Sequence, residues 1–425
     1  MNSRPTAIDL FSGAGGGGLG LTQAGFDLRW SVDLDPDAAR THQRHLPGAT
    51  VTGDIRALSD AALAQSVGMA PGELDLLFAG PPCQGFSMIG QRKIADLRNT
   101  LYREVIRATA VFKPKVVVIE NVPGLLTLAG GSYLASILAG LEDLGAQGYR
   151  TACAELLAAQ YGAPQMRWRL VIIAWRDDLG IPPGYGFPEP THGDSAIGDL
   201  VSNVTIPQRS YKGLLTTRAA IGDLPALEAG ETVSNYGGNP RYRFQKVART
   251  LPNGRRMNSS ELHDHYAAAL GETTLNRLRH LKPGEDWRDL PHELLPGSMQ
   301  RALRKDHTRR YRRMDWDGVP RAIITRFRDP KSGEYTHPEQ HRTISIREAA
   351  RIQGFPDWFS FAGSTTSKYV QVGNAIPVPL AKAIAAEIIS CLAGVPAGTR
   401  LVEPFRRRPI PFIGQHGELT ERIAA

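Results

Sequence analysis

Short apolar runs alternate with helical patterns through roughly the first 180 residues of the chain. The runs that predict strands lie at residues 6–11, 28–33, 74–79, 115–120 and 169–175. Segments with apolar residues at helical spacing lie near residues 36–45, 100–112 and 132–144. The runs at 115–120 and 169–175 are almost continuously apolar, which favours central parallel strands that are buried on both faces. The alternation predicts an α/β fold with a doubly wound, mostly parallel sheet.

The pattern changes near Ile181. From there to about residue 335 the chain is rich in Gly, Pro, Arg and His, and its periodicity is weak. Regular patterns resume at Thr343, and the stretch after Pro377 has helical spacing. The sequence therefore predicts an α/β domain at residues 1–185, a smaller domain at 186–338, a segment at 339–395 that returns to the first domain, and a peripheral tail at 396–425.

Charge is unevenly distributed along the chain, which carries a net charge of +8. Between Arg241 and Lys331 there are 21 Lys and Arg against 11 Asp and Glu, so the rest of the chain is slightly acidic. A basic segment beside a near-neutral remainder is typical of a nucleic-acid partner. Charge alone leaves a solvated basic face without function equally open.

The three cysteines, Cys83, Cys153 and Cys391, are widely spaced and suggest neither a disulfide framework nor a zinc site. The N-terminal residues lack the apolar stretch of a signal peptide. No apolar run reaches the length needed to span a membrane. We therefore expect a cytoplasmic protein that needs no membrane and no metal.

A glycine-rich loop follows the first predicted strand. Gly13, Gly15 and Gly18 in SGAGGGGLG satisfy the GxGxxG pattern, and a helical pattern follows. Asp33 ends the next predicted strand, where a carboxylate can accept hydrogen bonds from ribose hydroxyls, and Asp54 in GDI is a further acceptor at the same edge. These residues predict a site for an adenosine-containing cofactor. A nicotinamide dinucleotide would suit the loop equally well, and a turn required only for packing remains an alternative.

The predicted strand at residues 74–79 leads into GPPCQGFS. A thiol at the end of a parallel strand lies where ligands bind in this kind of fold. Cys83 could act as a nucleophile there if its surroundings lower its pKa below the free value of about 8.5. The alternative is a small buried core residue, but the flanking PP and QGFS favour the chemical role.

Polar residues also mark the end of the strand at 115–120. Glu120 ends this strand, where a carboxylate is costly unless it is paired or functional; a cap for the next helix is the alternative. Gln165, Arg167 and Arg169 alternate in APQMRWRL, which predicts three side chains on one face of an entering strand. Their donors could meet a carbonyl group and phosphates.

Six motifs occur together in the order that is typical of one family. They are DLFSGAGG, GPPCQGFS, ENV at 120–122, QMRWR, RTISIREAARIQGFPDWF and YVQVGNAIPVP, and DLRNTL after the cysteine also fits. On these motifs the chain resembles the bacterial DNA (cytosine-5)-methyltransferase family over about residues 6–395. The resemblance implies an S-adenosylmethionine-dependent methyltransferase fold and makes residues 186–338 a target-recognition domain for duplex DNA.

The resemblance also implies residue roles. Phe11 would stack near the adenine, with Asp33 on the ribose, Asp54 on the adenine amino group, and Asn374 closing the pocket. Leu34 stands where the family often has an aromatic residue. The implied cofactor-binding set is Phe11, Ser12, Gly13, Ala14, Gly15, Gly16, Asp33, Leu34, Asp54, Ile55, Pro82, Asn374 and Ala375. The implied DNA-binding set is Gln84, Ser87, Arg98 and Gln165, to which the density of the run adds Arg309, Arg310, Arg312 and Arg313 as phosphate contacts.

The implied mechanism needs a nucleophile because cytosine C5 is too weak to take a methyl group directly. Cys83 would attack C6, Glu120 would hydrogen-bond the N3 edge, Arg169 would contact the O2 side, and Arg167 would contact the loop or a phosphate. The target cytosine would have to be flipped out of the duplex. We expect a monomer, and a cognate restriction or other defence protein is the candidate partner in the cell.

Other classes of protein fit the sequence less well. A nicotinamide-dependent dehydrogenase would share the glycine loop but would not need PPCQ, ENV and QMRWR. A non-catalytic DNA-binding protein would keep the basic segment but could lose Cys83 or Glu120. A relative that acts on transfer RNA has the same chemistry, and the basic insert favours duplex DNA. The recognition sequence cannot be read from these residues.

Overall fold

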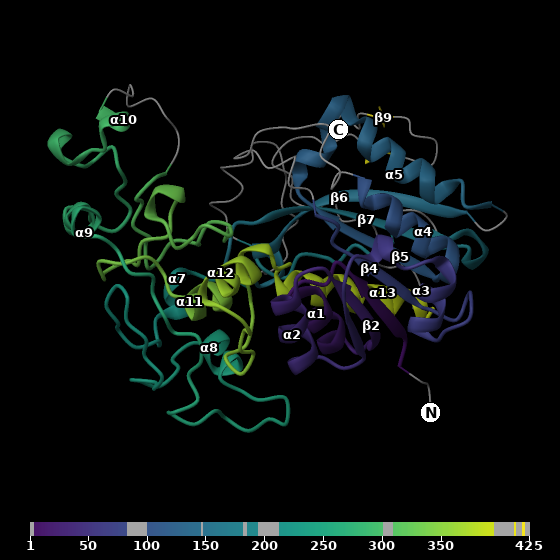
Figure 1. Cartoon of the computed structure of the whole chain (residues 1–425), viewed down its shortest axis with the longest axis horizontal. Coiled ribbons are helices and arrows are strands. Elements are labelled where there is room, and N and C mark those ends of the chain that lie inside the picture. The colour runs from purple at the N-terminus through teal and green to yellow at the C-terminus, as the bar shows by residue number, and fades with distance from the viewer. Residues whose placement is uncertain are drawn as a thin grey trace. The chain divides into compact units, whose positions relative to one another are not determined.

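The structure is a computed structural model that describes residues 4–82, 100–145, 148–181, 185–193, 212–300, 309–394, 412–413 and 419–420 (Figure 1). Four predicted site residues, Cys83, Gln84, Ser87 and Arg98, lie outside the described residues. The chain forms two compact units. Unit 1 comprises residues 1–161, 168–213 and 376–425, and unit 2 comprises residues 162–167 and 214–375.

A seven-stranded sheet forms the centre of unit 1, with the strand order β3-β2-β1-β4-β5-β7-β6. The strands are β1 (Thr6–Leu10), β2 (Asp27–Asp33), β3 (Ala49–Thr52), β4 (Leu76–Ala79), β5 (Val116–Asn121), β6 (Tyr149–Leu157) and β7 (Trp168–Arg176). The strands from β3 to β5 pair in parallel, whereas β7 is antiparallel to both β5 and β6. The sheet confirms the predicted doubly wound, mostly parallel α/β fold.

Three details of the sheet differ from the sequence prediction, one being that the short strand β3 (Ala49–Thr52) is not among the predicted strands. The run at residues 169–175 is not a parallel strand but part of the antiparallel strand β7, because burial on both faces produces an apolar run whatever the strand direction. The edge strand β6 was not predicted at all, since polar residues such as Arg150 and Glu155 interrupt its apolar pattern.

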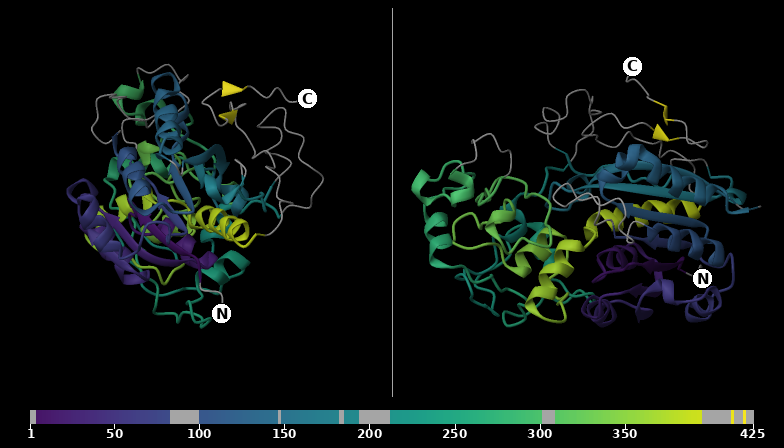
Figure 2. Two further views of the ribbon diagram at one scale, coloured as in Figure 1. Left: turned by 90° about the vertical axis from the view of Figure 1, so that its right-hand side faces the viewer. Right: turned by 45° about the horizontal axis from the view of Figure 1, so that its top comes forward.

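Helices cover both faces of this sheet (Figure 2). The helices are α1 (Gly16–Ala24), α2 (Pro36–His45), α3 (Asp60–Val67), α4 (Tyr102–Phe112), α5 (Ser132–Glu142) and α13 (Val378–Leu392), with short 3₁₀ turns such as η1 (Ile55–Ala57). Side chains from α3, α4 and α5 join strand residues such as Ile8 and Leu77 in one apolar cluster. On the other face α1 packs against Phe78 and α13. The N-cap Asp35 begins α2 by accepting bonds from the backbone N–H groups of Asp37 and Ala38.

Unit 2 has short helices and isolated bridges but no named strand among its described residues. Its helices are α7 (Thr217–Ile221), α8 (Arg243–Ala248), α9 (Glu272–Arg279), α10 (Gly297–Gln300), α11 (Ile346–Ile352) and α12 (Thr365–Asn374). A capping box formed by Ser345 and Glu348 begins α11. Residues 339–375, which the sequence assigns to the returning segment, belong to unit 2, and the chain re-enters unit 1 at Ile376.

Buried arginines organise the core of unit 2. Arg351 lies fully buried between two carboxylates, with 2.6 Å from Nη1 to Asp223 Oδ1 and 2.6 Å from Nη2 to Asp357 Oδ2. Arg342 is likewise buried and forms a bidentate pair with Glu348 at 2.7 and 2.8 Å. These pairs satisfy charges that would otherwise be costly to bury.

A short two-stranded sheet, β8 (Phe412–Ile413) with β9 (Leu419–Thr420), lies near the C-terminus. Across the described parts of the chain, no single helix is long and apolar enough to cross a membrane, and only α12 and α13 taken together across a break reach that length. In the same residues no group of three or more His, Cys, Asp or Glu side chains is placed to hold a metal ion.

Candidate active site

The glycine loop leaves β1 in a left-handed conformation. Phe11, Gly13 and Gly15 have φ angles of 58°, 54° and 100°. A side-chain carbon on Gly15 would lie 2.5 Å from Leu46 Cδ1, whereas nothing lies within 4 Å of one on Gly13 among the described residues. The loop is therefore packed against unit 1 at Gly15 and open at Gly13, as close approach of a ligand to the backbone requires.

Asp33 joins the end of β2 to this loop. Its Oδ2 accepts a hydrogen bond from Gly13 N at 2.7 Å, and its Oδ1 accepts one from Asp35 N at 2.9 Å. Burial raises the pKa of Asp33, and these two N–H donors act in the opposite direction. The carboxylate is thus fixed at the mouth of the loop with lone pairs left for further donors.

Two buried polar groups beneath the loop were not predicted from the sequence. Burial lowers the pKa of His42 to about 4, so its ring is neutral at pH 7, and its Nδ1 lies 3.0 Å from Thr50 Oγ1. The same ring would be 3.1 Å from a side-chain carbon on Gly15 or Gly18. Burial, reinforced by the nearby Asp33, raises the pKa of Asp9 well above its usual value.

The edge beyond β3 carries Asp54, at the start of the turn η1. Arg56 donates to this carboxylate from Nε, 3.0 Å from Oδ1, and from Nη2, 2.6 Å from Oδ2, and these bonds lower the pKa of Asp54. Ile55, the next residue, is buried in the core. Leu34 is 68% exposed, which is unusual for a large apolar side chain and leaves an apolar surface beside Asp33.

A charged pair lies at the ends of β5 and β7. Arg169 Nε lies 2.5 Å from Glu120 Oε1, and both side chains are largely buried. Oε1 receives no well-aligned hydrogen bond from the part of the chain that is described. Burial lowers the pKa of Arg169, and the charge of Glu120 opposes that effect. A side-chain carbon on Gly80 would lie 3.9 Å from Glu120 Oε2, so β4 ends beside this pair.

Asn121 connects the same pair to the residues before Cys83. Its Nδ2 donates to the Pro81 carbonyl at 3.2 Å, and its Oδ1 accepts from Val122 N at 2.8 Å. The backbone at Pro81–Pro82 is therefore anchored to β5, next to Glu120. The ENV motif carried the signal for this role, because Asn directly follows the acid at a strand end.

Gln165 and Arg167 do not share a strand face with Arg169, so that prediction is wrong. β7 begins at Trp168, and both residues lie in unit 2. Arg167 is buried and donates to the carbonyls of Ile323 and of Gly373, the latter at 3.2 Å. Gln165 is fully buried and donates to the Ile352 carbonyl at 2.9 Å. Both side chains are therefore engaged within unit 2 and are not available to a phosphate.

The predicted cluster of phosphate contacts divides in the structure. Arg313 is buried and donates to the carbonyls of Leu281, Leu278 and His337, and burial lowers its pKa to about 10. It is not available to a phosphate, which corrects the prediction. Arg309 and Arg312 both pair with Glu334 at 3.1 Å, and Arg310 is partly exposed. A phosphate role for these three remains a prediction.

The remaining predicted cofactor residues lie in both units. Ser12 and Ala14 belong to the glycine loop, Gly16 begins α1, and Pro82 follows β4, all in unit 1. Asn374 ends α12 and is exposed, while Ala375 is buried with its carbonyl accepting a bond from Gln353 at 3.3 Å; these two lie in unit 2.

Solved structures share this fold. A structure described as a DNA modification methyltransferase encoded within a prophage (E. coli) superposes with a TM-score of 0.65 at 24% identity, over 92% of this chain and 99% of that chain. The Dnmt2 methyltransferase of S. pombe superposes with a TM-score of 0.54 at 18% identity, over 92% and 99%. At these identities the likeness shows the fold alone.

The relatives found by sequence share a higher percentage of identical residues with this chain than these solved structures do. The type II methyltransferase M.AgeI of Thalassovita gelatinovora is 32% identical over 90% of this chain and 98% of its own length, and M1.HphI of Haemophilus parahaemolyticus is 33% identical over 90% and 86%. DNA (cytosine-5)-methyltransferase 1 of Gallus gallus is 31% identical over 91% of the chain, which spans 30% of that longer protein. Residues 6–390 match the sequence profile of the C-5 cytosine-specific DNA methylases, and the chain belongs to that family of enzymes.

Proposed function

We propose that this enzyme transfers a methyl group from S-adenosylmethionine to C5 of a cytosine flipped out of duplex DNA, through a covalent bond between Cys83 and C6. The observation that carries the proposal is the junction of β4 and β5. There the Glu120–Arg169 pair and the Asn121–Pro81 bond meet beside the segment that leads into Cys83. The names of the relatives agree with this substrate and this reaction.

The residues of the glycine loop suit an adenosine-containing methyl donor. The open backbone at Gly13, the fixed carboxylate of Asp33 and the exposed surface of Leu34 offer a close approach, acceptors for ribose hydroxyls and an apolar face for a base. Asp54 would accept from the adenine amino group if Arg56 shares the carboxylate. When bound, S-adenosylmethionine supplies an electrophilic methyl group on a sulfonium.

Cys83 is the nucleophile that makes cytosine C5 reactive enough to accept the methyl group. Its thiolate adds to C6, and the electron pair of the C5–C6 double bond becomes available at C5. After C5 is methylated, loss of the C5 proton and departure of the Cys83 thiolate restore the aromatic ring. The other two cysteines are poor candidates, because Cys153 is buried in the sheet and burial raises the pKa of Cys391 to about 11.

Glu120 and Arg169 would stabilise the charge that moves onto the pyrimidine. When the thiolate adds to C6, electron density shifts toward N3 and O2. Glu120 would bridge the N3 edge with a shared proton, and Arg169 would approach O2 with N–H groups that remain beyond its contact with Glu120. The largely buried position of the pair strengthens both interactions relative to water.

A modification role in a type II system is the context that M.AgeI and M1.HphI suggest, by their names. The enzyme would act on double-stranded DNA at the bacterial nucleoid. Bisulfite sequencing of host DNA, with and without the gene, tests the activity and reveals the recognition sequence.

Trapping with 5-fluorocytosine tests the covalent step. In the presence of S-adenosylmethionine, a duplex with 5-fluorocytosine at the methylated position should give a complex that survives denaturing electrophoresis. After methyl transfer C5 carries fluorine in place of the proton whose loss would release Cys83. Cys83→Ser should give no such complex, while the matched control Cys391→Ser should behave as wild type. Trapping by the Cys83→Ser variant, or a preference for transfer RNA over duplex DNA, would contradict the proposal.

A further inference from the structure

Arg107 lies on α4 and bonds to three separate parts of unit 1. Its Nε donates to Glu104 Oε2 at 2.8 Å on the same helix, and its Nη1 donates to Asp60 Oδ1 at 2.7 Å at the start of α3. Its Nη2 donates to the carbonyl of Ile55 at 3.0 Å. One planar guanidinium therefore holds α4, α3 and the turn η1 in a fixed relation.

The bond to the Ile55 carbonyl links Arg107 to the turn that carries Asp54. Ile55 directly follows Asp54, and its side chain is buried in the core. Within the turn, Ala57 N donates to the Asp54 carbonyl at 2.9 Å, Leu58 N donates to the Ile55 carbonyl at 3.2 Å, and Arg56 donates to the Asp54 carboxylate. The bond from Arg107 reaches the turn from a separate helix, α4. A displacement of Ile55 would therefore move the Asp54 carboxylate.

The two carboxylates around Arg107 give it the strength to act as this anchor. The Arg107 side chain is 25% exposed and that of Glu104 is 18% exposed, so this part of the network is partly shielded from water. Although burial alone would lower the pKa of Arg107, its bonds to Asp60 and Glu104 raise it. A charge-assisted donor of this kind holds a carbonyl more tightly than a neutral donor does.

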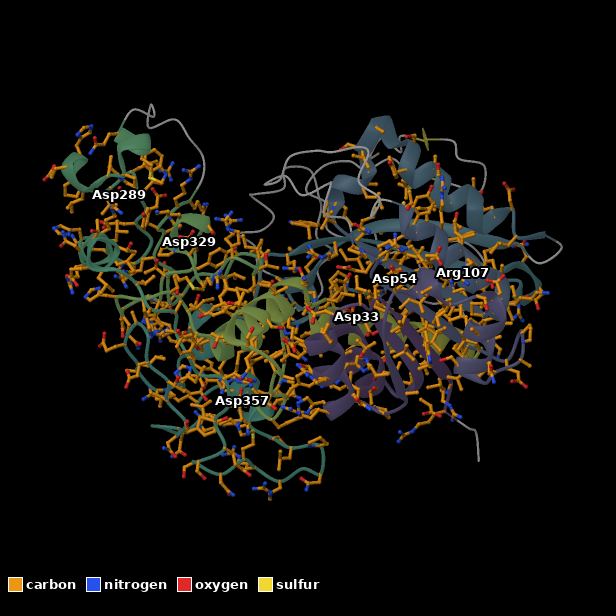
Figure 3. All side chains as sticks on the ribbon, viewed as in Figure 1. Asp33, Asp54, Arg107, Asp289, Asp329 and Asp357 are labelled. Carbon is orange, nitrogen blue, oxygen red and sulfur yellow. The ribbon has the colours of Figure 1, made fainter. Side chains whose placement is uncertain are left out.

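We propose that Arg107 is a positioning residue that fixes the Asp54–Ile55 turn for the adenosine end of the methyl donor, through the Ile55 carbonyl and without contact with the ligand. Figure 3 labels Asp33, Asp54 and Arg107 on unit 1. The inference rests on the proposed role of Asp54 in adenosine binding. It adds a residue that no sequence motif indicated, on the first described helix after the segment that contains Cys83.

The experiment measures binding of S-adenosylhomocysteine by titration calorimetry, in the absence of DNA, for wild type, Arg107→Met, Arg107→Lys, Asp54→Asn and the double variant Arg107→Met/Asp54→Asn. Arg103→Met is the matched control, because Arg103 is an exposed arginine on the same helix. We expect Arg107→Met to bind roughly tenfold more weakly, the scale of losing a charge-assisted bond, and Arg103→Met to bind as wild type. Arg107→Lys should fall in between, because an ammonium group keeps the charge but not the three-way geometry.

Kinetics and the double variant separate positioning from general stability. In Arg107→Met the KM for S-adenosylmethionine should rise about as much as the dissociation constant, while kcat at saturating donor stays within about twofold. Since both single changes act on one turn, their effects in the double variant should be less than additive. A lower melting temperature with unchanged affinity would overturn the proposal, as would full additivity or an equal loss in Arg103→Met.

The Asp54→Asn variant tests the role of Asp54 in adenosine binding separately from the positioning role of Arg107. If Asp54→Asn weakens binding and Arg107→Met does not, the positioning role fails while the cofactor assignment stands. If Asp54→Asn binds as tightly as wild type, the assignment of Asp54 to adenosine fails, and the role of Arg107 fails with it.

Discussion

Two buried charged residues, Glu120 in unit 1 and Arg351 in unit 2, are satisfied in different ways. At the junction of β4 and β5 in unit 1, Glu120 is largely buried, and its Oε1 contacts Arg169 but has no well-aligned hydrogen bond to any residue that the structure describes. In the core of unit 2, Arg351 is fully buried and shared between two carboxylates by hydrogen bonds of 2.6 to 3.3 Å. A buried, ion-paired carboxylate whose oxygen lacks an aligned donor is a candidate for contact with a substrate, whereas Arg351, with all of its donors engaged in aligned hydrogen bonds, indicates architecture.

The largest expected effect is that of Glu120→Gln, which keeps the size of the side chain and removes its charge. We expect kcat to fall by about 10²–10⁴-fold, the usual scale for a group that manages a proton in the reaction. Binding of S-adenosylhomocysteine should change little, and the melting temperature should fall less than in Arg351→Met, because the Gln carbonyl can still accept a hydrogen bond from Arg169. A kcat near that of wild type would show that Glu120 has a structural role, as Arg351 does, and that the two buried residues do not differ in function.

Arg351→Met should instead lower the stability of the protein more than its catalytic rate. The change leaves Asp223 and Asp357 buried without their shared partner, so we expect a loss of about 3–5 kcal/mol in the free energy of unfolding, measured by urea denaturation. Arg218→Met is the control, because Arg218 pairs with Asp317 at the surface and its loss should hardly move the denaturation midpoint. Equal stability of Arg351→Met and wild type would show that the buried pairs are not what holds unit 2 together.

The smallest expected effect belongs to Arg309→Ala/Arg312→Ala. Both arginines share Glu334, so part of their charge is already neutralised within unit 2. We expect the affinity for specific and random duplexes to fall equally, and the slope of log affinity against log salt to fall by at most about two, because the two arginines are predicted phosphate contacts. No loss on either duplex would show that this basic surface does not contact DNA.

The sequence predicted much of unit 1 because its signals are local. Apolar runs, the glycine loop and the polar residues at strand ends each depend on a few neighbouring residues, and the sheet follows from their alternation. It failed where direction or pairing depends on distant residues. Whether Arg169 lies on a parallel or an antiparallel strand is decided by its partner β5, and the contacts of Arg107 with Ile55 and Asp60 join residues about 50 positions apart in the chain.

The irregular second unit was the least predictable part of the chain. The arginines in the run at 309–313 cannot be told apart in the sequence. In the structure Arg313 donates to backbone carbonyls, whereas Arg309 pairs with the Glu334 carboxylate. Without helical or strand periodicity, nothing in the residue letters states which arginine faces inward. Gln165 and Arg167 were misplaced for a related reason, because the alternation rule holds only inside a strand and β7 begins after them.

The packing of α1 against α13 has a consequence for how the protein is made. A side-chain carbon on Gly20 would lie 2.6 Å from Ala381 Cβ, so the helix that carries the glycine loop is fitted closely to a helix about 350 residues later (Figure 2). At roughly 5–20 residues per second, a ribosome needs on the order of 20–70 s to synthesise that interval. Throughout that time α1 has no α13 to cover it, and closing so long a loop carries its own entropic cost. The newborn chain should therefore acquire its affinity for the methyl donor late, only after α13 has left the ribosome.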